Sequence, residues 1–131
     1  MASSANLIFL AIGYLLLKHA IADFTLQTRY QVSNKMTYGH PGGILHALIH
    51  AVLTLPVYFI FPSERAVILA ITSLEFLIHY HIDYLKECAV SRYGWTPENT
   101  PFWWALGADQ LLHNVTYLAI TAYLFAGIIE N

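Results

Sequence analysis

Residues 66–86 constrain the fold most strongly, because an apolar run passes directly into a ladder of ionisable side chains. The first part, residues 66–74, is apolar, and the whole segment is long enough to cross a bilayer. Glu75, His79 and Asp83 follow at intervals of four residues, so on an α-helix they share one face. Ionisable groups at membrane depth are costly and by default mark a functional site. We therefore expect a membrane helix that carries part of a polar site.

The composition extends this expectation to the whole chain. Of its 131 residues, 57% are hydrophobic and only 11% are charged, whereas about 25% are charged in an average soluble domain. A soluble protein of this size could not cover so much apolar surface, and a net charge of −2 argues against nucleic acid as a partner. We predict one all-α integral-membrane domain over residues 1–131, an antiparallel four-helix transmembrane bundle with helices at about 7–27, 44–61, 66–86 and 102–129.

Each of the other three apolar segments also carries a polar pair four residues apart. Short connectors make successive helices antiparallel, so the end of one helix lies beside the start of the next. The four pairs are therefore expected to meet at the same depth, near one face of the membrane. The predicted metal ligands are His19, Asp23, His46, His50, His79, Asp83, Asp109 and His113.

The pairs also repeat along the chain. The His19/Asp23 pair returns 60 residues later as His79/Asp83, and the histidine pair of the second segment is matched 63 residues later by an aspartate and a histidine. This spacing indicates two duplicated helical hairpins related by an axis along the membrane normal.

Five histidines and three aspartates from four helices are typical ligands for divalent metal ions such as Zn, Fe or Mn. Eight candidates exceed the needs of one tetrahedral ion, so we expect two ions, or one ion with supporting groups around it. Glu75, one turn deeper than His79, is the candidate catalytic residue as a general acid or base, with an extra ligand or an orienting group as alternatives.

Other polar residues are expected to have supporting or unrelated roles. Gln27, Gln110 and Asn114 are candidate hydrogen-bond partners of the site, although each could equally join two helices. His81 lies off the ladder face and His40 lies in a loop rich in glycine and proline, so both are expected outside the site. Lys18 is expected to extend its ammonium group to the membrane interface.

Four ordered motifs carry a resemblance that spans nearly the whole chain. They are His19-x-x-x-Asp23-Phe-x-x-Gln27, His46-x-x-x-His50, His79-x-x-x-Asp83 and Asp109-Gln-x-x-His113. Together they resemble a family of small bacterial and phage integral-membrane proteins of unknown function. The chain is also distantly similar to membrane-bound metal-dependent hydrolases with His/Asp pairs on short helices, which implies a hydrolytic activity by analogy alone.

Three functions are compatible with these residues. The favoured one is a metal-dependent hydrolase of a lipid or other amphiphile, in which metal-bound hydroxide attacks a carbonyl or phosphoryl group. The second is a non-haem di-iron oxidase or hydroxylase, and the third is a non-enzymatic membrane subunit stabilised by metal within a larger assembly. Ion passage is disfavoured, because the far ends of the four segments carry few polar groups.

Loop charges predict the orientation. The connectors on the site side carry Arg29, Lys35 and Arg92, whereas the opposite side carries Arg65 alone. By the positive-inside rule the site faces the cytoplasm, and a bacterial inner membrane is the expected location. Four helices form a thin wall around so polar a centre, so we also expect contact with membrane lipid and either a homo-oligomer or partner membrane subunits.

Overall fold

The structure, a computed structural model, describes residues 3–129, and these contain helices but no strand. The helical elements are α1 (Ser4–Ile21), the π-helical segment η1 (Ala22–Leu26), α2 (Arg29–Asn34), α3 (Pro41–Thr54), α4 (Val57–Ile60), α5 (Arg65–Tyr93) and α6 (Thr100–Ile129). Four stretches are long and apolar enough to cross a membrane: Ser4–Leu26, Pro41–Ile60, Arg65–Tyr93 and Thr100–Ile129. The prediction of an all-α four-helix bundle is confirmed.

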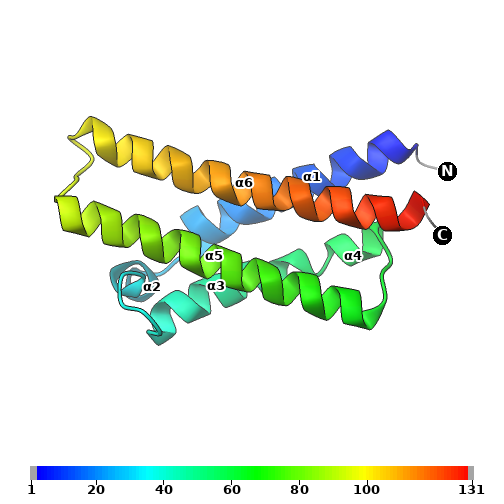
Figure 1. The fold of residues 1–131 in the computed structure, drawn as a ribbon, viewed down its shortest axis with the longest axis horizontal. Helices are drawn as coiled ribbons and strands as arrows, with labels where there is room; N and C mark the ends of the chain where they lie inside the picture. The colour runs from blue at the N-terminus through cyan, green and yellow to red at the C-terminus, as the bar shows by residue number, and fades with distance from the viewer. Residues whose placement is uncertain (1–2, 130–131) are drawn as a thin grey trace.

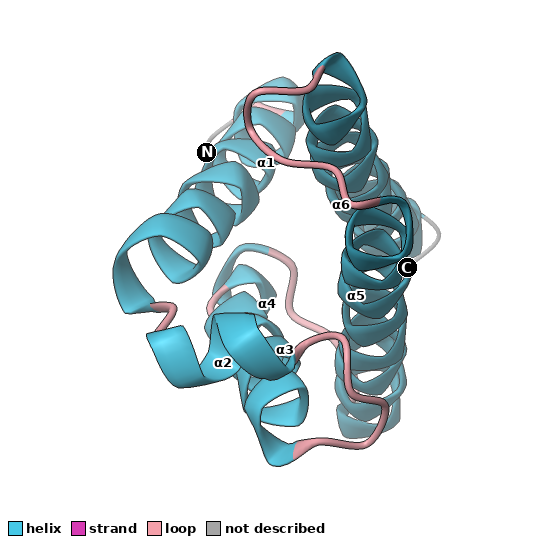
Figure 2. Cartoon of the chain, turned by 90° about the vertical axis from the view of Figure 1, so that its left-hand side faces the viewer, coloured by secondary structure: helices cyan, strands magenta, loops and turns pink. Residues whose placement is uncertain are grey.

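The four long helices form a closed ring in which every neighbour is antiparallel. Helix α1 packs on α3, α3 on α5, α5 on α6, and α6 back on α1 (Figure 2). Both termini lie at one end of the bundle, while α2 and the turn between α5 and α6 lie at the other (Figure 1). All four pairs of polar residues are therefore carried by helices that enclose the same interior.

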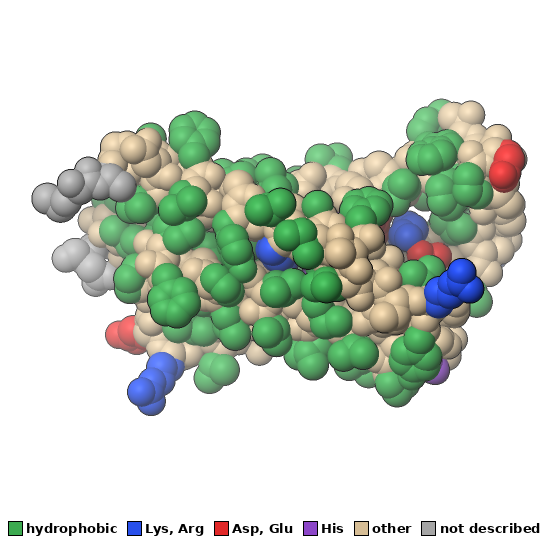
Figure 3. All heavy atoms as spheres, turned by 180° about the vertical axis from the view of Figure 1, so that it is seen from behind, with side chains coloured by type: hydrophobic (Ala, Val, Ile, Leu, Met, Phe, Trp, Pro, Cys, Tyr) green, Lys and Arg blue, Asp and Glu red, His purple; other side chains and the backbone are tan. Residues whose placement is uncertain are grey.

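The outer surface suits a lipid environment. Large apolar side chains point outwards from several helices; Phe24, Phe59 and Leu69 are 77%, 91% and 69% exposed. On the face shown in Figure 3, apolar side chains dominate the middle, and most of the charged side chains in view gather near the two ends. This distribution is what four helices crossing an apolar layer require.

The interior is divided into two layers along the bundle axis. Towards the termini the core is apolar, and it consists of Ala11, Leu15, Val57, Tyr58, Phe61, Tyr117, Ile120 and Leu124. Towards the other end most of the buried side chains are histidine, carboxylate or lysine. The apolar layer lies between the polar layer and the end of the bundle that carries the termini.

The first span changes character just before the polar layer. The α-helix ends at Ile21, and residues 22–26 continue as the wider π-helical segment η1, which contains Asp23. Segments of this kind are rare and are found mostly at functional sites. Gln27 donates from Nε2 to the backbone carbonyl of Asp23 (3.1 Å) and so satisfies a group that the end of the helix leaves free.

The connector that follows is not wholly irregular, because it contains the short helix α2. Thr28 begins this helix through a reciprocal capping box with Gln31. The start of α3 packs tightly on α2: a Cβ on Gly42 would lie 2.9 Å from the carbonyl oxygen of Tyr30. Only glycine allows this approach, which folds the connector back over the end of the bundle.

The second span is broken at a proline. Helix α3 ends at Thr54 and α4 begins at Val57, with Pro56 between them. A proline cannot donate the backbone hydrogen bond that would continue α3. His40 caps the other end of α3, where its Nδ1 accepts from the backbone N–H of Gly42 (3.1 Å).

Helix α5 continues to Tyr93, beyond the expected end near residue 86, and α6 begins at Thr100. The end of α5 is set by Gly94, which adopts the left-handed conformation (φ 63°). Asp83 and Asp109 therefore lie inside their helices, not at the ends.

Trp103 and Trp104 are exposed on α6, about 8 Å along the axis from Asp109 at 1.5 Å per residue. Tryptophans are enriched at membrane interfaces, and an interface at Trp103 and Trp104 would place the polar layer just inside the apolar region.

Candidate metal centre

The polar layer brings all eight predicted ligands together from η1, α1, α3, α5 and α6. Seven of these side chains are buried, and Asp23 is 12% exposed. Six of them form two groups that could hold a metal ion and that share one residue, His79. The geometry of each group and of the two remaining residues follows.

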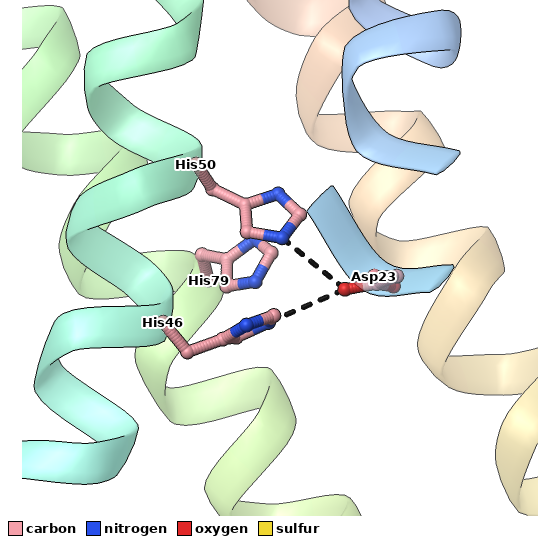
Figure 4. Close-up of side chains that lie close together, drawn as sticks. All are labelled: Asp23, His46, His50 and His79. Atoms are coloured by element: carbon pink, nitrogen blue, oxygen red, sulfur yellow. Dashed lines mark hydrogen bonds and ion pairs between the residues drawn. The ribbon is translucent and has the colours of Figure 1, made fainter. Parts of the chain in front are cut away.

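The first group is formed by Asp23, His46, His50 and His79, whose ligand atoms all lie within 4.8 Å of one another. Figure 4 shows the three imidazoles of α3 and α5 on one side and the carboxylate of η1 opposite them. Asp23 Oδ1 lies 3.2 Å from His46 Nε2 and 3.1 Å from His50 Nε2. One carboxylate oxygen therefore faces two ring nitrogens.

The second group is formed by His79, Asp83 and His113. Asp83 Oδ2 lies 3.5 Å from His79 Nε2, and Oδ1 lies 3.5 Å from His113 Nε2. The rings of His79 and His113 are stacked, with centroids 4.1 Å apart and planes 5° from parallel. Asp83 also approaches the first group, because Oδ2 is 3.1 Å from His46 Nε2.

His19 and Asp109 flank the two groups. His19 Nε2 lies 3.1 Å from Asp23 Oδ2, and Nδ1 is hydrogen-bonded to the Tyr117 hydroxyl (3.0 Å). A partner on one ring nitrogen fixes the tautomer and leaves the other nitrogen available to a metal. Asp109 Oδ1 lies 3.9 Å from His113 Nε2. Gln110 donates to Oδ2 of both Asp23 (3.2 Å) and Asp109 (3.1 Å), so it connects the carboxylate of the first group to Asp109.

Four of the five imidazoles present a buried Nε2 atom that has no hydrogen-bond partner among the described residues. These are His19, His46, His79 and His113. The nitrogens lie near carboxylate oxygens but out of line for hydrogen bonds. Two atoms that share a tetrahedral ion with bonds of ~2.1 Å lie about 3.4 Å apart, which is close to the measured separations. The residues therefore could hold metal ions without large movement.

Two lysines, Lys18 and Lys35, are buried beside the site, and the position of Lys18 differs from expectation. Lys18 is only 3% exposed, so it does not extend to the interface. Its Nζ donates to Glu75 Oε1 (2.7 Å) and to the backbone carbonyl of His50 (2.9 Å). Lys35, from the connector after α2, pairs with Asp83 Oδ2 at 2.9 Å. The folded connector thus contributes a charge to the polar layer.

Glu75 lies one turn deeper than the ligand groups, at the boundary with the apolar core. It is 2% exposed, and its Oε1 accepts from both Lys18 and Thr54 (2.8 Å). Its second oxygen, Oε2, is buried and has no hydrogen-bond partner. The carboxylate belongs to neither ligand group.

Counted with neutral imidazoles, the charges of the layer do not balance. Four carboxylates are enclosed, and lysines pair with two of them, Glu75 and Asp83. Among the described residues, neither Asp23 nor Asp109 has a lysine or arginine within ion-pair distance. Unpaired carboxylates in an apolar surrounding are unfavourable. A bound divalent cation would supply the missing charge.

Some residues of the site were not singled out from the sequence, although two of them continue its pattern. Thr54 extends the ladder of His46 and His50 by one more interval of four, and Tyr117 extends that of Asp109 and His113 in the same way. Both face the boundary of the polar layer. Following each ladder one turn further would have found them.

The two histidines expected outside the site do lie outside it. His40 caps α3, and His81 is exposed, with Nδ1 bonded to the backbone carbonyl of Leu77 (2.7 Å). Asn114 is half-buried on α6.

Comparison with known proteins places the chain in a family. The pattern that defines the family described as Protein of unknown function (DUF3307) matches residues 11–130. The chain belongs to this family. The match covers all four polar pairs of this DUF3307 chain, and no curated protein and no solved structure matches it. The family name carries no activity, so the chemistry of this DUF3307 site has to be argued from its own residues.

The buried ion pair of Lys18 and Glu75 is expected to contribute to the thermal stability of the fold. Removing one partner leaves a charge buried without compensation and costs about 3–5 kcal/mol. Lys18→Met and Glu75→Gln should each lower the thermal unfolding midpoint in detergent with chelator present, and the double variant should recover part of the loss. Lys86→Met is the control, since its pair with Glu87 is partly exposed and worth at most about 1 kcal/mol. Additive losses in the double variant would contradict the pairing.

Proposed function

We propose that this chain is an intramembrane hydrolase that uses two divalent metal ions and acts on a lipid or another amphiphile. The observation that carries the proposal is the set of four buried, unpartnered Nε2 atoms beside two carboxylates that lack a compensating charge. A merely structural polar core would be expected to satisfy its buried nitrogens with hydrogen bonds. The donor set instead fits cations.

The two ligand groups suggest how two ions would be held. Asp23, His46 and His50 would hold one ion, and Asp83 and His113 would hold the other. His79 belongs to both groups and lies between them. A pair of divalent ions in such a site polarises a carbonyl or phosphoryl oxygen and generates hydroxide from water at neutral pH.

The remaining residues would hold and move protons. Tyr117 would orient His19 through Nδ1, and Gln110 would orient the carboxylates of Asp23 and Asp109. Glu75 lines a small void together with His79 and His113. Its unpartnered Oε2 is placed to accept a proton at the edge of the ligand groups, as a general base requires.

The activity is tested with metal-free protein reloaded separately with Zn²⁺, Mn²⁺ or Fe²⁺. The substrates are a panel of acyl esters and phosphate esters of long-chain alcohols in mixed micelles, with and without oxygen. We expect Zn²⁺ or Mn²⁺ to support release of the alcohol without oxygen. His113→Gln should abolish this release, while the matched variant His81→Gln should retain it because His81 lies outside the site.

Two outcomes would contradict the proposal. Turnover that requires both Fe²⁺ and oxygen would indicate an oxidase. If the metal-loaded protein cleaves neither class of ester, the result would indicate a non-enzymatic metal site.

We further propose that the site end of the bundle faces the cytoplasm of a bacterium, with the protein in the inner membrane. The support is the excess of basic residues at that end, where Arg29, Lys35 and Arg92 stand against Arg65 at the other.

The orientation is tested with the single cysteine of the chain, Cys88, which lies in the part of α5 beyond the site. A membrane-impermeant maleimide should leave Cys88 unlabelled in intact cells and should label it after the membrane is opened. Cys88→Ser/Ser63→Cys, with the new thiol at the other end of the bundle, should be labelled in intact cells. The reverse pattern would place the site outside.

A further inference from the structure

On the side of α5 and α6, a few side chains separate the polar layer from the outer surface. A groove of about 540 Å³ runs along these two helices, which lie side by side in Figure 1. Its walls are apolar side chains from both helices, and small residues, Ala70 on α5 and Ala119 on α6, face it where the groove is open. Glu75 is the one carboxylate among its lining residues.

The groove adjoins the candidate metal centre. A second, smaller void is lined by Glu75, Ile78 and Thr116, which also line the groove, and by His79 and His113. Three side chains therefore form the common wall between the lipid-facing groove and two of the candidate ligands. Glu75 is one of the three and is only 2% exposed, and its Oε2 has no hydrogen-bond partner among residues 3–129.

The depth of the groove limits what can occupy it. Its α6 residues run from Val115 to Tyr123, about 17–29 Å along the axis from Trp104 at 1.5 Å per residue. Asp109 lies about 8 Å from the same tryptophan. The groove therefore begins just below the polar layer and continues towards the far side of the apolar region, which is about 30 Å thick in a bilayer.

We propose that this groove holds the hydrocarbon chain of an amphiphile that enters sideways from the bilayer between α5 and α6. The inference rests on the proposed hydrolytic function for the assignment of that amphiphile as the substrate. Its polar group would lie at the wall formed by Glu75, Ile78 and Thr116, next to His79 and His113, and its chain would extend down the apolar groove. By the distances above, this polar group would lie about midway through the apolar region, and the chain would extend towards the far interface.

Three features favour a chain over a protein helix as the occupant. The groove runs along two helices that are already packed together, and a hydrocarbon chain is much narrower than a helix, which is about 10–12 Å across with its side chains. Its lining is mostly apolar and includes one carboxylate, as an amphiphile with one polar group requires. Its inner end adjoins His79 and His113, which a partner helix would have no reason to approach.

The probe that tests the groove is a palmitate analogue with a diazirine near the chain end, used at trace level in nanodiscs. After photolysis, the labelled residues are mapped by mass spectrometry. We expect labels to concentrate on residues 70–78 of α5 and 115–123 of α6. Ala119→Phe and Ala70→Phe, which fill the groove from opposite walls, should each lose most of this labelling. Ala122→Phe is the matched control, because Ala122 is equally exposed on α6 but does not line the groove.

Labelling spread evenly over the outer surface, or unchanged in both filled variants, would overturn the proposal. All variants are compared by their thermal unfolding midpoint, so a loss of labelling in a folded protein is attributable to the filled groove. The experiment is repeated on metal-free protein. Labelling of the groove there, combined with no hydrolysis in the loaded protein, would support the binding site while rejecting the proposed activity.

Discussion

The structure depends on the burial of charge in an apolar environment. Four carboxylates and five imidazoles lie inside a bundle whose outer surface is apolar, and only two lysines accompany them. Such groups are tolerated at membrane depth when they face the bundle interior and pair with one another. Each of the four long helices contributes to this layer, so its formation fixes the rotation and the depth of every helix in the ring.

The local features of the fold serve the same layer. The π-helical segment η1 carries Asp23, the close contact of Gly42 with α2 folds the connector over the site, and that connector places Lys35 beside Asp83. Below the layer, the apolar core closes the far end of the bundle. The result is a polar site with apolar surroundings, which the side chains of Glu75, Ile78 and Thr116 separate from a lipid-facing groove along α5 and α6.

The sequence predicted the helical bundle and the meeting of the polar pairs, because an interval of four residues places side chains on one helix face regardless of tertiary structure. It did not predict the position of Lys18. A lysine near the end of an apolar segment looks like an interfacial anchor, and its partner Glu75 is 57 residues away. The pairing of Lys35 was not predictable either, since its contact with Asp83 depends on the fold of the connector. Pairings between distant segments leave no local pattern in a single sequence.

Metal analysis of the purified protein tests directly whether the polar layer binds divalent ions. The wild type is purified without chelator from cells supplied with Zn, Mn and Fe, beside Asp23→Asn/Asp83→Asn and the control His81→Gln. We expect about two equivalents of metal per chain in the wild type and the control, and a loss in the double variant. A wild-type protein that is folded but binds no metal would contradict it, and the polar layer would then be a hydrogen-bonded core without a metal-dependent function.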